Sequence, residues 1–349
     1  MITSRRVISR RNVLATGGAL TASLAVPGLI GRAHAQVRTL KISHQFPGGS
    51  IEQGDFRDRL TQIFAREVAK RTNGALKFEI HANSSLMKTV AQFSALRKGG
   101  LDFSLYPLAY AGGEVHATNI GLMPCLVSSY EQAAKWKSAP IGKALEKIVD
   151  DKGVKIIAWV WQAGGVASRT VPILVPDDVK GIGIRGGSRE MDLMLAAAGG
   201  RVSTAPSNEI YIGMQTGALG AAVTSSTSLI SFRLEELSKA LTTGRNRSFW
   251  FMLEPLLMSK DIYNSLKPDE QKAVLEVGVE MEAFAFAEAR KDDETVAKVY
   301  AAKGAQVADM TDEQLAKWRV IAEASAWKDY AAKSTEAAEL MKLALAVSS

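Results

Sequence analysis

The chain contains little of what builds metal, redox or disulfide sites. Its 349 residues include one cysteine and four histidines. The single thiol, Cys125, cannot form an intramolecular disulfide, and its apolar neighbours are typical of a buried structural cysteine. Beyond residue 35 the histidines, His44, His81 and His116, are widely spaced, so the sequence gives no support for a zinc site. We expect neither a metal nor a cofactor.

Motifs of nucleotide-binding proteins and hydrolases are also missing. The sequence has no P-loop and no HExxH pattern. Residues 181–186 formally match GxGxxG, but these glycines lie inside a predicted strand, and Ala205 stands where an acidic ribose partner would be expected. The hydroxyl-rich run at residues 225–228 lacks the glycines of a nucleophile elbow. The sequence therefore does not indicate an enzyme.

Long apolar runs are absent after the first 35 residues, so no later segment is predicted to cross a membrane. Residues 1–35 contain five arginines, no acidic residue, and small residues before Gln36. This pattern is typical of a cleaved export signal, and the pair Arg10-Arg11 resembles a twin-arginine signal. A membrane anchor is the alternative, but the apolar run is short and contains Pro27. We expect a soluble, periplasmic mature protein.

A strong net charge is absent once this leader is removed. The full chain has 43 basic and 36 acidic residues, a net charge of +7. Without the five leader arginines, 38 basic residues remain against 36 acidic ones, a net charge of +2. No basic stripe is interleaved with aromatic residues, so nucleic acid is not an expected partner.

Strand-like and helix-like segments alternate from residue 37 onward. The first three strands are expected at residues 40–42, 76–80 and 101–105, with helices at about 55–71 and 87–98. This succession predicts βαβ units and a largely parallel sheet. Ligands bind beyond the carboxyl ends of such strands. That rule selects residues 44–49, which include Phe46, and residues 106–110, which include Tyr106 and Tyr110.

Two lobes are expected, because the 314 residues left from 349 after a 35-residue leader exceed a typical single domain. An apolar segment ends at residues 162–165, which we interpret as a flexible junction where the chain crosses to the second lobe. A strand-like segment at 248–253 returns it. The predicted boundaries are 36–163 with 247–290 for lobe I, and 164–246 with 291–349 for lobe II.

A single long helix is predicted near the end of the chain. Pro268 and the acidic residues after it are helix-start signals, and no helix breaker appears before Gly304. This exceeds an ordinary globular helix, so we expect one helix spanning both lobes. Thr311 and Gln314 form a capping-box pattern for a further helix.

Arg185 is the strongest candidate for ligand binding. It ends a short alternating strand and is followed by two glycines. A planar guanidinium at a strand end, beside glycines that let a ligand approach the backbone, suits a carboxylate. From the residues alone, a surface salt bridge explains the pattern equally well. Glu209 could orient Arg185, or could be a surface residue in the first turn of a helix.

The central segment resembles the DctP-type solute-binding proteins of TRAP transporters. The resemblance covers nearly the whole mature chain, and the motifs that carry it are Arg169-Thr-Val, PDDVKGIGIR at 176–185, Glu209-Ile-Tyr211 and Gln215-Thr-Gly217. It implies a two-lobe binding protein with a hinge, crossed by a long helix, which closes around an organic acid and delivers it to a TRAP permease.

The resemblance also implies roles for individual residues. Arg185 would pair with the substrate carboxylate, Arg169 would assist, and the strand with Thr224 and Ser225 would contribute polar groups. This sequence departs from many sugar-acid and dicarboxylate binders, which have acidic or amide groups on that strand. Aromatic residues are expected nearby: Phe46, Tyr106, Tyr110, Trp161 and Phe249. We therefore hypothesise a monocarboxylate with an apolar or aromatic body.

Three alternatives remain. A binding protein of an ATP-driven transporter shares the fold, although the long helix argues against it. A ligand sensor would differ only in its signalling partner. A periplasmic enzyme is least favoured, because no acid/base or nucleophile pair is visible. We expect a monomer, with a dimer as the alternative.

Overall fold

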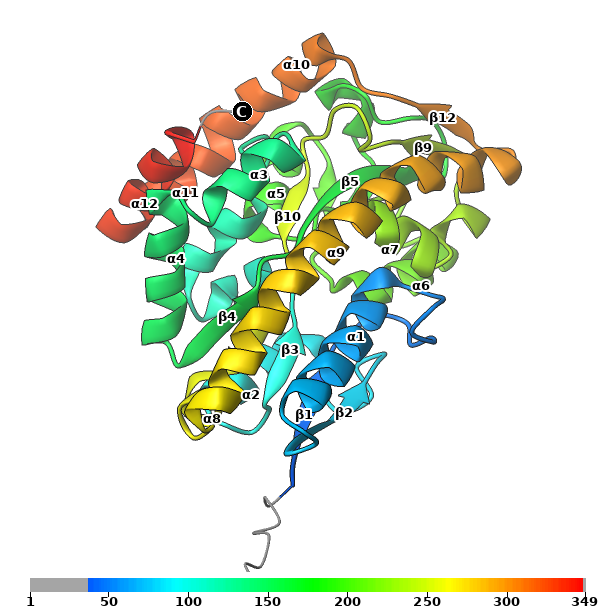
Figure 1. Ribbon diagram of the computed structural model, residues 1–349. Coiled ribbons are helices and arrows are strands. Elements are labelled where there is room, and N and C mark those ends of the chain that lie inside the picture. The colour runs from blue at the N-terminus through cyan, green and yellow to red at the C-terminus, as the bar shows by residue number, and fades with distance from the viewer. Residues whose placement is uncertain (1–36, 348–349) are drawn as a thin grey trace, which may run out of the picture. The chain divides into compact units, whose positions relative to one another are not determined.

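Two β-sheets, connected by helices, build residues 37–347, the part of the chain that the computed structural model describes (Figure 1). The first sheet has five strands in the order β2-β1-β3-β11-β4. The second has seven, with β12-β9-β5-β8-β6-β7 in line and β10 paired with β5. The predicted α/β fold with two lobes is confirmed. The predicted export signal at residues 1–35 lies outside the described residues.

The strands of both sheets are short. Those of the first sheet are β1 (Arg38–Ser43), β2 (Leu76–His81), β3 (Phe103–Leu105), β4 (Val154–Ala158) and β11 (Leu256–Ser259). Those of the second are β5 (Trp161–Ser168), β6 (Gly183–Arg185), β7 (Arg201–Val202), β8 (Ala221–Ser225), β9 (Ala240–Thr242), β10 (Phe251–Leu253) and β12 (Gln306–Ala308). In the first sheet β1, β2 and β3 are parallel and β11 is antiparallel to its neighbours, so the predicted parallel sheet carries one reversed strand.

Helices occupy most of the connections. They are α1 (Phe56–Arg71), α2 (Gln92–Arg97), α3 (Tyr130–Trp136), α4 (Pro140–Asp151), α5 (Arg189–Ala197), α6 (Ile210–Gln215), α7 (Ser226–Ser231), α8 (Lys260–Asn264), α9 (Pro268–Ala302), α10 (Asp312–Ala322), α11 (Lys328–Ala332) and α12 (Thr335–Leu345). The capping box predicted for α10 is confirmed, because Thr311 and Gln314 exchange hydrogen bonds between side chain and backbone.

Helix α1 packs on the first sheet through aromatic rings. Phe64 of α1 meets Phe78 of β2 and Phe103 of β3 edge-on, with ring centroids 5.8 and 5.5 Å apart. Such pairs stabilise a core beyond the area that they bury. At the start of the helix, Asp55 accepts a hydrogen bond from the backbone of the first turn. The helix predicted at about residues 55–71 is therefore confirmed.

The chain crosses between the sheets in extended strands. The prediction of a flexible junction at residues 162–165 is wrong, because these residues are buried inside β5. A Cβ on Gly164 would lie 2.3 Å from the Trp250 ring and 2.4 Å from the carbonyl oxygen of Thr224. The glycine here marks a close approach of neighbouring chain segments. The exact lobe boundaries stay a prediction.

Helix α9 is the predicted long helix, 35 residues in one piece. It packs against α1 and β4 of the first lobe and against α7 and β5 of the second (Figure 1). Contact with β4 is close, because a Cβ on Gly278 would lie 2.3 Å from the carbonyl oxygen of Ile157. The prediction of one helix spanning both lobes is confirmed. Neither α9 nor another helix within residues 37–347 has the length and apolar character needed to cross a membrane.

Candidate functional site

Side chains at strand ends of the two sheets contact each other across the lobes. Tyr110 lies in a short 3-10 segment after β3, and its hydroxyl bonds to Arg185 at the end of β6. Arg57, in the first turn of α1, reaches Ser225 at the end of β8. We call the region defined by Arg57, Tyr110, Arg185 and Ser225 the interlobe site.

Arg185 is held by neutral acceptors. Its side chain is buried, with 1% of the residue exposed. Nε donates to the carbonyl oxygen of Ala205 at 2.9 Å, Nη1 to that of Val223 at 2.8 Å, and Nη2 to the hydroxyl oxygen of Tyr110 at 2.7 Å. These bonds use three of the five guanidinium N–H groups. One N–H remains on each terminal nitrogen, and such a pair can bind both oxygens of a carboxylate.

No carboxylate neutralises Arg185 within residues 37–347, because none of the ion pairs there includes it. Asp192 is near, but its oxygens accept hydrogen bonds from the Gly186 backbone and the Thr204 hydroxyl. Burial raises the pKa of Asp192, while the hydrogen bond from Thr204 and the charge of Arg185 oppose that rise. A buried cation without an ion-pair partner is costly. An anionic ligand would therefore be strongly stabilised at Arg185.

Tyr110 joins the two lobes beside a pocket of about 310 Å³. Its hydroxyl oxygen accepts a hydrogen bond from the Ser207 backbone at 3.1 Å as well as the one from Arg185. Tyr106 packs edge-on against it, with ring centroids 6.1 Å apart. The pocket is lined mostly by small and apolar residues from both lobes, among them Ala109, Gly112, Gly187, Ala205 and Pro206. The surroundings of Tyr110 are therefore mainly apolar.

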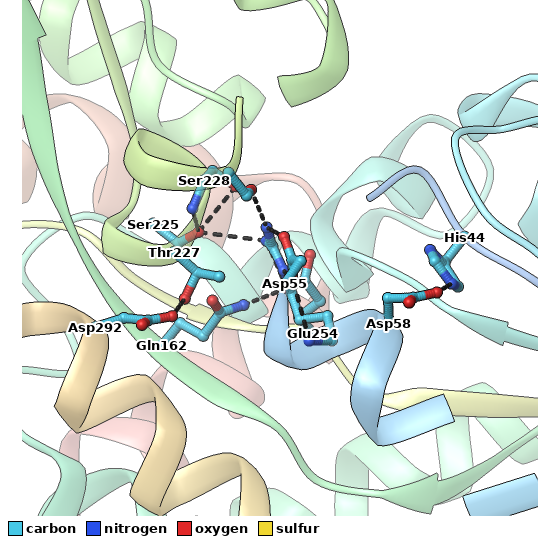
Figure 2. Close-up of polar contacts among 11 residues, drawn as sticks. His44, Asp55, Asp58, Gln162, Ser225, Thr227, Ser228, Glu254 and Asp292 are labelled. Carbon is cyan, nitrogen blue, oxygen red and sulfur yellow. Dashed lines mark hydrogen bonds and ion pairs between the residues drawn. The ribbon is translucent and has the colours of Figure 1, made fainter. Parts of the chain in front are cut away.

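Arg57 is the second fully buried arginine of the interlobe site, and carboxylates surround it. Its Nε and Nη2 donate to the two oxygens of Asp55 at 2.9 and 2.7 Å, and Nη1 lies 3.3 Å from Glu254 Oε2. The guanidinium also lies over the Phe46 ring, 3.7 Å from its centroid. Figure 2 shows Asp55 and Glu254 beside Ser225, with Gln162 donating to Glu254.

The charges of this cluster shift the acidity of its members. Burial alone would raise the pKa of Asp55, but the charge and hydrogen bonds of Arg57 outweigh it and hold that pKa below the usual value. Burial raises the pKa of Glu254 to about 7, although Arg57 opposes the rise. Asp55 is therefore the firm counter-charge of Arg57, and Glu254 carries a proton for part of the time near neutral pH.

Strand β8 brings the two arginines to the same strand end. Arg185 donates to the Val223 carbonyl and Arg57 donates to the Ser225 hydroxyl, two residues farther along the strand. Thr224, a predicted site residue, lies buried between these two positions. Successive alternate residues of a strand are about 7 Å apart. The two guanidinium groups therefore bond to neighbouring positions at this strand end.

Arg169 and Glu209 are exposed. Within strand β5, Gly164 pairs with Ser225 at the interlobe site, and Ser168, the last residue of the strand, pairs with Ala221 at the other end of β8. Arg169 follows Ser168, so it lies roughly 15 Å along the strand from the site. Glu209 ends a short 3-10 segment before α6 and makes no hydrogen bond to Arg185 among the described residues. The structure thus does not bring these two residues to Arg185.

Trp161 and Phe249 pack in other places. Trp161 contacts Trp136, with ring centroids 5.2 Å apart, and lines a separate pocket of about 220 Å³ beside α3 and α9. Phe249 packs on Trp318 of α10, with centroids 4.8 Å apart. Sequence proximity suggested a shared pocket, but side chains along a strand alternate between its two faces. Phe46, Tyr106 and Tyr110 do lie at the interlobe site.

Sequence reasoning did not find Arg57, Gln162 or Glu254. Arg57 stands among charged residues at a helix start, where a solvated surface position is the ordinary expectation. Gln162 lies in the segment that the sequence predicts as a flexible junction. Glu254 did carry a recognisable pattern, since an acidic residue directly follows an apolar strand. Within residues 37–347, no group of three or more histidine, cysteine or acidic side chains is arranged to hold a metal ion.

Comparison with known proteins identifies the family. Residues 52–334 match the family described as bacterial extracellular solute-binding protein, family 7, also called DctP. The chain belongs to this family. A solute-binding protein of Albidiferax ferrireducens is 57% identical over 337 residues, covering 97% of this chain and 99% of that protein. Family membership implies a periplasmic location for this solute-binding protein.

Solved structures agree with this assignment. A TRAP periplasmic solute-binding protein from Rhodoferax ferrireducens, with bound malonate, is 60% identical, with a TM-score of 0.86 over 87% of this chain and 96% of that one. DctP7 of Bordetella pertussis, a receptor that binds pyroglutamic acid, shares the fold at 19% identity, with a TM-score of 0.79 over 88% of this chain and 99% of that one. This chain is thus a TRAP-type solute-binding protein with the two-lobe fold.

Proposed function

We propose that the protein captures an organic acid in the periplasm and delivers it to the membrane subunits of a TRAP permease. One observation carries the ligand class. Arg185 is buried, makes no ion pair within residues 37–347, and keeps one N–H on each terminal nitrogen after its three hydrogen bonds. A carboxylate supplies both the missing charge and two acceptors.

Capture requires that the ligand favour the closed arrangement of the lobes. Arg185 belongs to the second lobe and Tyr110 to the first, and they are already joined by a hydrogen bond. A carboxylate on Arg185 would touch residues of both lobes and so shift the population toward closure. We assign binding without chemical turnover, because the chain belongs to a solute-binding family.

The body of the acid faces Tyr106, Tyr110 and Phe46 in this proposal. Tyr110 also lines the apolar pocket of about 310 Å³. This supports the hypothesised monocarboxylate with an apolar or aromatic body, although Trp161 and Phe249 contribute to other pockets. Export through a twin-arginine route and action as a monomer complete the proposal.

Isothermal titration of the mature chain tests the role of Arg185. Malonate is the first ligand to use, because a 60%-identical structure holds it. Arg185→Ala should weaken binding by at least about thirtyfold, since truncating one partner of a buried charge pair costs about 2–5 kcal/mol. Arg66→Ala, at an exposed arginine of the first lobe, is the matched control. Equal affinities of Arg185→Ala and wild type across a panel of carboxylic acids would contradict the proposal.

A further inference from the structure

Several buried side chains within residues 37–347 have polar atoms without a hydrogen-bond partner, and four of these side chains, in the first lobe and in strand β5, are considered together. The atoms are both amide atoms of Gln45, the hydroxyl of Tyr106, Oε1 of Gln162 and Oε1 of Glu254. Each of these residues is 1% exposed or less. Buried polar groups are nearly always paired, because leaving one unpaired costs free energy. Several such atoms together call for a partner that the chain itself does not supply.

Three of these side chains, those of Gln45, Tyr106 and Glu254, follow one edge of the first sheet. The last registered pair of β1 and β3 is Ser43 with Ser104, and Gln45 and Tyr106 each lie two positions beyond it. The Tyr106 backbone donates to the carbonyl oxygen of Pro255 at 3.1 Å, directly after Glu254. This is the edge from which Tyr110 reaches Arg185 and Arg57 reaches Ser225.

Gln162, in strand β5 of the second sheet, is the fourth of these side chains. Its Nε2 donates to Glu254 Oε2 (Figure 2). When Glu254 is ionised, its carboxylate only accepts hydrogen bonds, so the NH₂ group of Gln162 faces Glu254 and the amide carbonyl oxygen is left free. Through Glu254, Gln162 is connected to Arg57, and Tyr106 packs against Tyr110, so these side chains border the interlobe site.

The chemistry of these atoms restricts the ligand. Oε1 of Gln162 can only accept a hydrogen bond, and Oε1 of Glu254 accepts one when the carboxyl is ionised. Tyr106 and Gln45 can donate or accept. A hydrocarbon body would cover these atoms without pairing them, and a site built for hydrogen bonding rejects a ligand that lacks the matching group. Pairing the acceptor oxygens of Gln162 and Glu254 therefore requires an O–H or N–H donor on the ligand.

We propose that the ligand is an acid whose body carries at least one hydroxyl or N–H group, placed to donate to Gln162 and Glu254 while its carboxylate pairs with Arg185. The inference rests on the proposed function and sharpens it. The body remains compact and in part apolar where it meets Phe46, Tyr106 and Tyr110. Gln45 and Tyr106 pair with any further polar group on the same side.

Matched pairs of acids test this inference in the wild-type protein. Suitable pairs are lactate and propionate, mandelate and phenylacetate, and pyroglutamate and cyclopentanecarboxylate, measured by titration calorimetry at one pH and salt concentration. In at least one pair the donor-bearing acid should bind at least about tenfold more tightly, since an unpaired buried acceptor costs about 1–3 kcal/mol. Equal or reversed affinities in every pair would overturn the inference.

Single variants identify which residue is responsible for the preference for the donor-bearing acid. In Gln162→Leu the ratio of affinities within the preferred pair should fall toward one, because the amide acceptor is lost. In Gln306→Leu, at an exposed glutamine of β12, the ratio should stay as in wild type. An unchanged ratio of affinities in a folded Gln162→Leu protein would also overturn the assignment to this residue. If Gln162→Leu does not fold, the same ratio is measured in Gln45→Leu.

The outcomes separate the two proposals. Binding of acids without any preference for the donor-bearing member leaves the proposed function intact and removes only this inference. Failure of the refolded, ligand-free wild type to bind any acid, malonate included, removes both.

Discussion

The two buried arginines of the interlobe site differ in how their charge is met. Arg57 is enclosed by the carboxylates of Asp55 and Glu254 and lies on the ring of Phe46. Arg185 bonds to two carbonyl oxygens and one hydroxyl. Both side chains are almost completely buried. The same residue type is therefore part of the framework in one place and a receptor for an anion in the other.

The difference follows from the cost of burying charge. An arginine paired with carboxylates has little left to offer a ligand, and removing it would leave those carboxylates unpaired. An arginine held by neutral dipoles has a fixed geometry and an unmet charge. Burial alone would therefore not have told which arginine binds the ligand. The hydrogen-bond and ion-pair partners of each guanidinium distinguish the two roles.

The largest difference expected between the two arginines is in the free energy of unfolding of their variants. Arg57→Met should lower the free energy of unfolding of the ligand-free protein by about 3–5 kcal/mol, because it leaves Asp55 and Glu254 buried without their cation. Arg185→Met should change it by no more than about 1–2 kcal/mol, because the loss of three hydrogen bonds is offset by removal of an unpaired buried charge. Urea unfolding of both variants at pH 7 measures the difference.

A reversal of that order would break the comparison. If Arg185→Met were the more destabilising variant, Arg185 would be part of the framework, and Arg57 would become the better candidate for the ligand. Arg66→Met, at an exposed position, controls for the change of side chain.

The next largest effect concerns pH. Burial raises the pKa of Glu254 to about 7, whereas the ordinary pKa of a glutamate, which applies in the unfolded chain, is 4.5. Between these values the folded protein binds more protons than the unfolded one, so stability falls as pH rises from about 4.5 to 7 and then levels off. For Glu254 the loss amounts to at most about 3 kcal/mol. Asp292 and Asp293, whose pKa values burial raises to about 6, add to the same trend.

Glu254→Gln should weaken this dependence of the free energy of unfolding on pH, because the variant lacks the proton that Glu254 binds in the folded protein. Urea unfolding at pH 5, 6, 7 and 8 gives the slope for the wild type and the variant. Glu313→Gln, at an exposed glutamate, should leave it as it is. An identical slope in Glu254→Gln and wild type would show that Glu254 titrates normally, and Arg57 would then have two permanent counter-charges.

The smallest expected effect concerns Tyr110. Tyr110→Phe removes the hydroxyl that accepts hydrogen bonds from Arg185 and from the Ser207 backbone. Affinity for a carboxylic acid should fall about tenfold, because a hydrogen bond to a charged group contributes about 1.5–3 kcal/mol. Titration calorimetry against Tyr263→Phe, a tyrosine of α8 in the first lobe, measures this. Unchanged affinity would mean that Arg185 is held adequately by its two carbonyl partners.

Much of the fold could be predicted, because its helices and strands are indicated by patterns among residues that are close together in the sequence. Alternating apolar residues predicted β1 and β2, and the capping pattern of Thr311 and Gln314 predicted the start of α10. The unbroken helical stretch after Pro268 predicted α9. The glycines at 164 and 165 were misinterpreted as flexible, because the sequence does not show which backbone lies against a residue. Close approach and flexibility use the same amino acid.

The site was predictable only where chemistry and strand position coincide. Tyr106 and Tyr110 were selected by the rule that ligands bind at the carboxyl ends of parallel strands, and Arg185 by its guanidinium at a strand end beside glycines. Arg57 was not, because its charge is an ordinary feature of a helix start until Asp55, Phe46 and Glu254 enclose it. Trp161 and Phe249 were expected beside the ligand with the other aromatic residues, yet their rings pack in separate places.

The sequence by itself determined the secondary structure, the alternation that makes two α/β lobes, and the long helix, because short-range periodicity and helix caps encode these. Only the tertiary structure decided which charges meet. Asp55 and Glu254 are 199 positions apart, yet both neutralise Arg57, while no residue described in the structure forms an ion pair with Arg185. Electrostatic balance in a buried site depends on distances of a few ångströms, and those distances are set by packing between segments remote in the chain.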